Sequence, residues 1–143
     1  IIERALLKVS WPGRFEVIND SVILDGGHNP EGVESLKKTI KAYTAKDVIV
    51  VFCAMKDKEK IKMINEIESF SKKIIFTEID YYRSEKAQNL IELSQNTDNI
   101  VIENYIDAIK FALKGLKKDE IVVFNGSLYF ISKVRKYFKE GKC

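Results

Sequence analysis

The sequence predicts a three-layer α/β domain in which about six strands, mostly parallel, lie between two layers of helices. Short, continuous apolar runs alternate along the chain with segments of helical periodicity. This alternation is typical of parallel strands joined by right-handed crossovers. Two strand-like runs near the N-terminus follow each other too closely for a crossover, so we expect one antiparallel strand at an edge. A chain of 143 residues is long enough to bury one core.

Five short apolar runs indicate strands that are buried on both faces of the sheet. These runs are residues 22–25, 48–53, 73–79, 99–104 and 120–125. A further strand-like run precedes the first of them and is joined to it at Asn19-Asp20. Asparagine and aspartate tolerate the left-handed backbone of a tight turn, so this pair predicts a hairpin.

The segments between these runs place apolar residues at helical spacing. The expected helices are residues 31–43, 60–70, 85–94, 105–116 and 128–138. One buried face of the second helix is expected to hold Ile61, Ile64, Ile67 and Phe70. Gly115 is a candidate C-cap. Strands and helices in this order predict a Rossmann-like arrangement.

Composition excludes several classes of function. The 24 basic and 21 acidic residues leave a net charge of +3, which is too balanced to favour nucleic acid or an anionic membrane. The longest apolar run, residues 48–55, is too short to cross a bilayer, and the N-terminus lacks the pattern of a signal peptide. We therefore expect a cytoplasmic monomer, with the basic stretch 133–142 as a solvated helix face. Cys53 lies in an apolar run and Cys143 ends the chain, so neither a disulfide nor a zinc site is expected.

Three polar loops follow the carboxyl ends of expected parallel strands. They span residues 25–30, 54–58 and 125–127. Ligands of open parallel sheets bind beyond these strand ends. We therefore expect the three loops to share one rim of the sheet, although they lie far apart in the sequence.

The first loop, Asp-Gly-Gly-His-Asn-Pro at residues 25–30, combines several nucleotide-binding features. The Asp25 carboxylate could accept hydrogen bonds from a ribose diol, and the two glycines after it let the backbone approach a ligand. His28 has an aromatic face and two ring nitrogens. Asn29 can cap the next helix, whose N-terminus favours an anion. The same residues could equally form an ordinary tight turn, and no G-x-G-x-x-G or phosphate-loop motif accompanies them.

The stretch Trp-Pro-Gly-Arg at residues 11–14 is the second unusual feature. Pro12-Gly13 predicts a turn. Arg14 leaves that turn at the start of a strand, where its guanidinium could grip a phosphate with two hydrogen bonds or form a surface ion pair. Trp11 is expected to serve packing.

The other two loops offer weaker candidates. Lys56 and Lys58 flank Asp57 and could neutralise a carboxylate or phosphate, or could be solvated. Ser127 precedes the last helix and is first a candidate N-cap and second a ligand donor. No spacing along the chain predicts a metal site.

Taken together, these stretches resemble one known family. "WPGRFEV", "DGGHNPEGVESL", "AMKDKE" and "NGSLYFISKVRKYF" follow one another over nearly the whole chain. In this the sequence is similar to the C-terminal domain of the folylpolyglutamate synthase/dihydrofolate synthase family, within the Mur ligase superfamily. The related cell-wall ligases usually carry a tyrosine where this chain has Gly26, so Gly26, with Asn29 before Pro30, favours the folate branch.

The resemblance implies a reaction that the full-length enzyme would perform. ATP phosphorylates the terminal carboxylate of a folate, and the amine of L-glutamate attacks the acyl phosphate to give an amide, ADP and phosphate. Mg²⁺ assists, and often a monovalent cation such as K⁺. In this family a larger N-terminal domain carries the phosphate loop and most metal ligands, and the C-terminal domain closes over the nucleotide and helps to hold glutamate.

The resemblance also implies roles for individual residues. Arg14 matches the arginine that contacts the ATP phosphates, and Asp25 matches the aspartate that binds the ribose. His28 matches a histidine near the nucleotide and the reaction centre and is the one candidate for a catalytic group in this domain. Lys56, Lys58 and Ser127 match positions that contact the incoming amino acid.

The N-terminal domain of the family is missing from the sequence. We therefore expect residues 1–143 to be the C-terminal domain of a longer enzyme, inactive alone, whose partners are its own N-terminal ATPase domain, folate and L-glutamate. Two alternatives stay open. One is the same domain of a cell-wall amino-acid ligase, and the other is a stand-alone, non-catalytic nucleotide-binding module.

Overall fold

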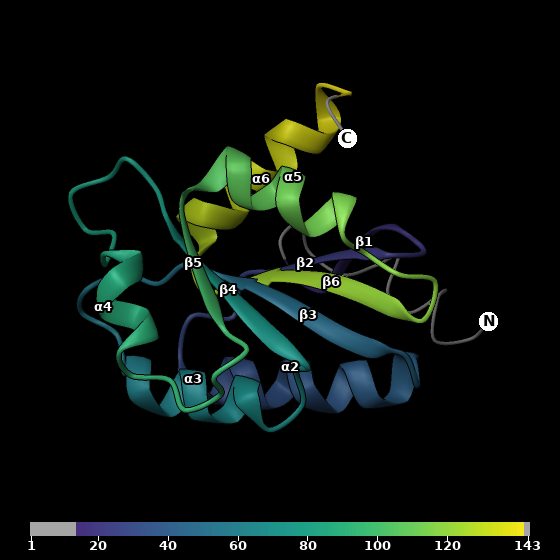
Figure 1. Ribbon diagram of the computed structural model, residues 1–143, viewed down its shortest axis with the longest axis horizontal. Coiled ribbons are helices and arrows are strands. Elements are labelled where there is room, and N and C mark those ends of the chain that lie inside the picture. Colours follow the sequence, from purple (N-terminus) through teal and green to yellow (C-terminus); the bar gives the residue numbers. More distant parts are fainter. Residues whose placement is uncertain (1–13, 142–143) are drawn as a thin grey trace.

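A six-stranded sheet forms the middle layer of the computed structural model, which describes residues 14–141 (Figure 1). The strands are β1 (Glu16–Asn19), β2 (Val22–Asp25), β3 (Asp47–Phe52), β4 (Lys73–Glu78), β5 (Ile100–Asn104) and β6 (Glu120–Asn125). The helices are α2 (Pro30–Tyr43), α3 (Lys60–Glu68), α4 (Ala87–Ile91), α5 (Tyr105–Lys114) and α6 (Leu128–Lys139).

The strand order is β1-β2-β6-β3-β4-β5. Only β1 and β2 pair antiparallel, and β1 lies at an edge of the sheet. The predicted fold class is therefore confirmed. The last strand, β6, lies between β2 and β3, and its final residue Asn125 is level with Asp25 on one side and Phe52 on the other. This register brings the ends of three loops together.

Helices cover both faces of the sheet, as Figure 1 shows: α2 and α3 lie on one side, and α5 and α6 lie on the other. Two buried apolar clusters fill the spaces between the layers. One joins the sheet to α2, α3 and α4 and includes Leu36, Ile64 and Phe76. The other joins the sheet to α5 and α6 and includes Phe124 and Phe130. Continuous apolar strands fit this arrangement because both of their faces are covered.

The helix predictions hold with two corrections. In α3, Ile61 is 55% exposed and Met63 is buried in its place. The buried face is set by Met63, Ile64 and Ile67, and at about 100° of rotation per residue Ile61 then points away from it. Helix α4 is shorter than the expected 85–94, because Lys86 has an extended backbone and the residues before it are tied to a neighbouring loop.

Helix ends follow the predicted local chemistry. Asn29 caps α2 by accepting a hydrogen bond from the Gly32 N–H at 2.7 Å, with Pro30 in the first turn. Ser127 caps α6 and Gly115 is the C-cap of α5. None of the described helices is long and apolar enough to cross a membrane. The predictions on Trp11, the Pro12-Gly13 turn and Cys143 lie outside the described residues, and Cys53 is a buried free thiol.

Candidate functional site

Three of the predicted site residues, Arg14, Asp25 and His28, line one hollow at the carboxyl edge of the sheet. The hollow has a volume of about 450 Å³ and lies between the end of β2, the first turns of α2 and Leu128 at the start of α6. We call it the Asp25 hollow. Asp25 and His28 belong to a loop that the strand-end rule places at this edge. The structure brings Arg14, which precedes β1, to the same hollow.

Asp25 is held at the last position of β2 as a mostly buried acid. Its carboxylate accepts a hydrogen bond from the Gly27 N–H at 2.7 Å. Burial raises the pKa of this carboxyl, and hydrogen bonds from the Gly27 and Phe15 backbones and the nearby Arg14 guanidinium oppose that rise. A carboxylate with acceptor capacity left over, beside a guanidinium, can bind hydroxyl groups on one side of an anionic ligand.

The glycines of this turn serve close packing of the backbone. A Cβ on Gly32 would lie 3.0 Å from the Gly27 Cα, and a Cβ on Gly27 would lie 3.1 Å from both the Gly32 carbonyl and an Asp25 carboxylate oxygen. Neither glycine has a positive φ. The turn therefore lies directly against the first turn of α2 because neither position carries a side chain.

The ring of His28 is oriented by its own turn. Its Nδ1 lies 3.2 Å from the Gly26 carbonyl oxygen. A carbonyl only accepts, so this contact needs the proton on Nδ1 and leaves Nε2 as an acceptor. His28 can thus present Nε2 to a ligand or to a proton.

Asn125 organises this site, although its side chain was not singled out in the sequence. Its side chain is fully buried at the end of β6, and its Nδ2 donates to the Asp25 carbonyl at 2.9 Å and to the Gly27 carbonyl at 3.3 Å. It therefore fastens the Asp25 turn to the neighbouring strand. A polar residue that ends an apolar run directly before Gly-Ser is the signal that could have found it.

We expect Asn125→Ala to destabilise the domain by about 2–3 kcal/mol, because two backbone carbonyls lose the buried side chain that donates to them. Urea unfolding followed by circular dichroism measures the change. The matched control is Asn65→Ala on the exposed side of α3, which should stay within about 0.5 kcal/mol of wild type. An equal loss in both variants would contradict the role of Asn125.

Gly126 and Ser127 shape the next turn. Gly126 has a φ of +126°, and a Cβ there would lie 2.1 Å from the Cys53 carbonyl oxygen. Ser127 is buried, and its Oγ accepts from the Tyr129 N–H at 3.1 Å and the Phe130 N–H at 3.5 Å. The predicted N-cap is confirmed, and the proposed contact of Ser127 with an amino acid stays a prediction.

Lys56 lines a second hollow, of about 610 Å³, which we call the Lys56 hollow. Its wall carries both charges: Lys56 and Lys86 are basic, and the acidic residues are Glu78, Asp80 and Glu103. Lys58 is absent from the described lining of both hollows. The structure thus separates Lys56 from the Asp25 hollow, and it does not place Lys58 in either.

Arg83, which the sequence analysis did not single out, contacts the loop after β3 and the first turn of α6. Its Nη2 donates to the Asp57 carboxylate at 3.1 and 3.4 Å, and its guanidinium lies 5.8 Å from the ring centre of Tyr129. Tyr129 follows Leu128, which lines the Asp25 hollow. One partly buried cation therefore contacts residues from both parts of the rim.

The described residues contain no group of three or more histidine, cysteine, aspartate or glutamate side chains that could hold a metal ion. We therefore assign none of the side chains in the described range 14–141 to the Mg²⁺ or K⁺ that the family resemblance implies.

Comparisons with known proteins agree with this geometry. Residues 13–128 match the family described as "Mur ligase, glutamate ligase domain". The chain is 40% identical over 141 residues to the dihydrofolate synthase/folylpolyglutamate synthase of Bacillus subtilis. The aligned region covers 96% of this chain and 33% of that protein. It is 34% identical over 129 residues to a UDP-N-acetylmuramoyl-L-alanyl-D-glutamate–2,6-diaminopimelate ligase of Clostridium acetobutylicum, covering 82% of this chain and 27% of that protein.

Solved structures show the same fold. Escherichia coli FolC in complex with ADP matches with a TM-score of 0.85 at 24% identity, over 92% of this chain and 32% of that chain. Folylpolyglutamate synthase of Mycobacterium tuberculosis complexed with ADP matches with a TM-score of 0.83 at 22% identity, over 92% and 33%. The chain spans about a third of the length of these relatives. The family match, the six-stranded sheet and the strand-end loops together show that the chain belongs to the Mur ligase family, as a glutamate ligase domain.

Proposed function

We propose that this chain is the C-terminal domain of an ATP-dependent ligase that adds L-glutamate to folate through an acyl phosphate. The observation that carries the proposal is the Asp25 hollow, where Arg14, Asp25 and His28 converge at the carboxyl edge of the sheet. The 40% identity to the B. subtilis enzyme, whose name states both synthase activities, supports the folate branch. Phosphate release with dihydropteroate as the acceptor would add the dihydrofolate synthase step to this activity.

In this proposal the Asp25 hollow receives ATP. The Asp25 carboxylate accepts hydrogen bonds from the ribose hydroxyls, and the Arg14 guanidinium contacts the phosphates. The Nε2 of His28 faces the nucleotide side, because Nδ1 is used by the Gly26 carbonyl. Arg14 and Asp25 also attract each other, so an anionic phosphate group on Arg14 and neutral hydroxyls on Asp25 suit the charges of both residues.

The Lys56 hollow is the proposed site for the incoming amino acid. L-glutamate carries two carboxylates and one ammonium group. The basic Lys56 and Lys86 suit the carboxylates, and the acidic Asp80 and Glu103 suit the ammonium group. Contacts from Lys58 and Ser127 to the amino acid remain predictions from the family resemblance.

A larger N-terminal ATPase domain completes the proposal. Acyl phosphate formation requires positioned phosphates and charge stabilisation. The relative from B. subtilis is about three times as long as the part that matches this chain. We propose that such a domain holds the ATP phosphates together with Mg²⁺ and K⁺, that it folds with this chain into a cytoplasmic monomer, and that the present domain alone does not turn over.

A cell-wall ligase is the second candidate, because the chain is also 34% identical to the C. acetobutylicum diaminopimelate ligase. The two candidates differ in the acceptor that is phosphorylated. Both would use ATP, so the proposed nucleotide contacts of Arg14 and Asp25 do not distinguish them.

The test is ATP-dependent phosphate release by the protein encoded by the full reading frame that contains this chain. Tetrahydrofolate and dihydropteroate are each offered with L-glutamate, and a UDP-muramoyl acceptor is offered with L-glutamate and with 2,6-diaminopimelate. We expect release with a pteridine acceptor and a loss of at least about tenfold in Arg14→Ala, because one charge-assisted contact is worth about 1.5–3 kcal/mol. Release with the muramoyl acceptor alone would support the cell-wall ligase. No release from a folded protein would favour a non-catalytic nucleotide-binding module.

A further inference from the structure

The loops that carry Lys56 and Arg83 are fastened to each other as a short antiparallel pair. Met55 and Ser84 form an isolated β-bridge. On one side of it the Lys56 N–H donates to the Arg83 carbonyl at 2.8 Å, and on the other the Glu85 N–H donates to the Ala54 carbonyl at 2.9 Å. The backbones of Lys56 and Arg83 are therefore held side by side by hydrogen bonds.

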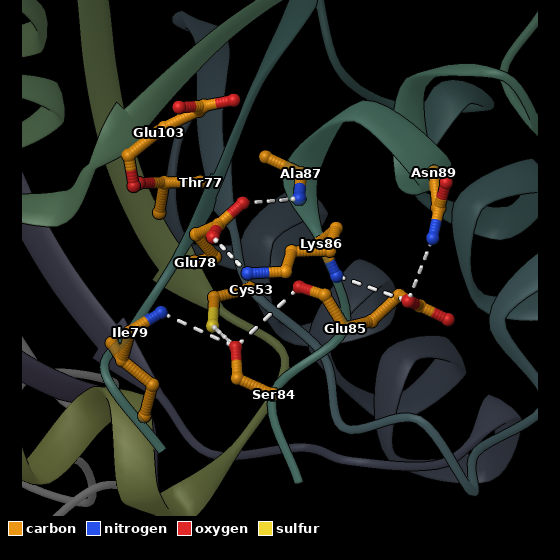
Figure 2. Close-up of polar contacts among 10 residues, drawn as sticks. All are labelled: Cys53, Thr77, Glu78, Ile79, Ser84, Glu85, Lys86, Ala87, Asn89 and Glu103. Carbon is orange, nitrogen blue, oxygen red and sulfur yellow. Dashed lines mark hydrogen bonds and ion pairs between the residues drawn. The ribbon is translucent and has the colours of Figure 1, made fainter. Parts of the chain in front are cut away.

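Ser84 is one of the two residues of this bridge, and Figure 2 shows its side-chain contacts with Cys53, Ile79 and Glu85. Ser84 is 5% exposed. Its Oγ accepts from the Ile79 N–H at 3.2 Å, lies 3.4 Å from the Glu85 carbonyl oxygen to which it can donate, and lies 3.8 Å from the Cys53 Sγ. The Ser84 hydroxyl thus makes contacts within the segment 79–85 and also contacts Cys53, directly after β3.

Neighbouring contacts hold the flanks of the same segment. Figure 2 shows Glu78 accepting from the Ala87 N–H and from Lys86, at 2.8 and 3.5 Å. Lys60 pairs with Glu85 at 3.3 Å and donates to the Lys56 carbonyl at 2.6 Å. These outer contacts involve exposed or partly exposed side chains, whereas the Ser84 hydroxyl belongs to a buried residue that also lines the Lys56 hollow. Loss of that hydroxyl would leave the Ile79 N–H without its acceptor, so the segment would have to move to satisfy it.

We propose that Ser84 is a positioning residue for the amino-acid substrate: its buried hydroxyl sets the place of the segment 79–85 against the loop 54–56 and so the place of Lys56 at the wall of the Lys56 hollow. This inference rests on the proposed function, in which L-glutamate occupies that hollow. Ser84 acts through Lys56, and small displacements of a substrate-binding group are costly for recognition.

The test uses the full-length enzyme and measures kcat and KM for L-glutamate, ATP and folate in Ser84→Ala. We expect the KM for L-glutamate to rise about tenfold while kcat and the other two KM values stay within about twofold, because uniform binding of one substrate is lost. The matched control is Ser94→Ala, which removes a hydroxyl that donates to the Ile91 carbonyl at 2.7 Å at the far end of α4. Ser94→Ala should change no KM.

Ser84→Thr keeps the hydroxyl and should restore the KM for L-glutamate, and it also serves if Ser84→Ala does not fold. Lys56→Ala should raise the same KM, and the double variant Lys56→Ala/Ser84→Ala should add little to it, because the serine acts through the lysine. If Lys56→Ala leaves the KM for L-glutamate unchanged, the proposed occupant of the hollow is wrong. If Lys56→Ala raises it and Ser84→Ala does not, the positioning role alone is overturned.

Discussion

In the full-length enzyme, Asp25→Asn is expected to weaken ATP binding about 10- to 100-fold, because the charge-assisted hydrogen bonds that we propose between Asp25 and the ribose would lose about 1.5–3 kcal/mol. The substitution keeps the shape of the side chain. An amide oxygen at the same place can still accept from the Gly27 N–H, which lies 2.7 Å from the wild-type carboxylate. Isothermal titration with ATP measures the loss of binding.

The same variant should be as stable as wild type at neutral pH, or more stable. Burial raises the pKa of the Asp25 carboxyl above its ordinary value of 3.8. A carboxyl with a raised pKa costs the folded state stability, and this cost grows as pH rises from the unfolded pKa through the folded pKa. Asparagine carries no charge, so the difference in unfolding free energy between the variant and wild type should increase over that pH window and then stay constant.

Urea unfolding of both proteins at a series of pH values checks the second half of this prediction. Gln88→Glu on exposed α4 is a suitable control for the effect of one charge at the surface. If Asp25→Asn is less stable than wild type at neutral pH and equal to it in acid, then hydrogen bonds and Arg14 outweigh burial and the direction assigned to the Asp25 pKa is wrong. Unchanged ATP binding would remove Asp25 from the nucleotide site.

Gly126→Ala is expected to lower the free energy of unfolding by about 4 kcal/mol or more, which exceeds the usual effect of a single substitution. Two causes act together. The φ of +126° strains any residue with a side chain, and the new Cβ would lie 2.1 Å from the Cys53 carbonyl oxygen. That oxygen belongs to the main chain at the end of β3, so β3 and β6 would have to separate.

Thermal and urea unfolding of the domain measure this loss. Gly141→Ala is the matched control, since Gly141 also has a positive φ, of +72°, but no atom lies within 4 Å of its added Cβ. Backbone strain alone should cost it about 1 kcal/mol. Similar losses in the two variants would show that conformation, and not the close approach of β3 and β6, sets the cost at Gly126.

Sequence patterns of short range determined most of the fold. Continuous apolar runs predicted the strands because both faces of this sheet are covered, and Asn29 and Ser127 were predicted as N-caps from chemistry that acts within one turn. The strand-end rule placed the loop of residues 25–30 at the carboxyl edge of the sheet, and the structure adds Arg14 to the hollow there. Ile61 was assigned wrongly because an apolar residue at helical spacing does not by itself define which stripe of α3 packs.

Only the tertiary structure decided the contacts that organise the site. The insertion of β6 between β2 and β3 brings Asn125 to the Asp25 turn, 100 residues away in the chain. The pairing of Ser84 with the loop after β3 likewise joins segments that no periodicity relates. Strand order and register follow from the summed burial of two faces of the sheet and not from any local preference. For this reason the sequence indicated the candidate residues Arg14, Asp25 and His28, and the packing of distant strands decided which side chains hold the Asp25 turn in place.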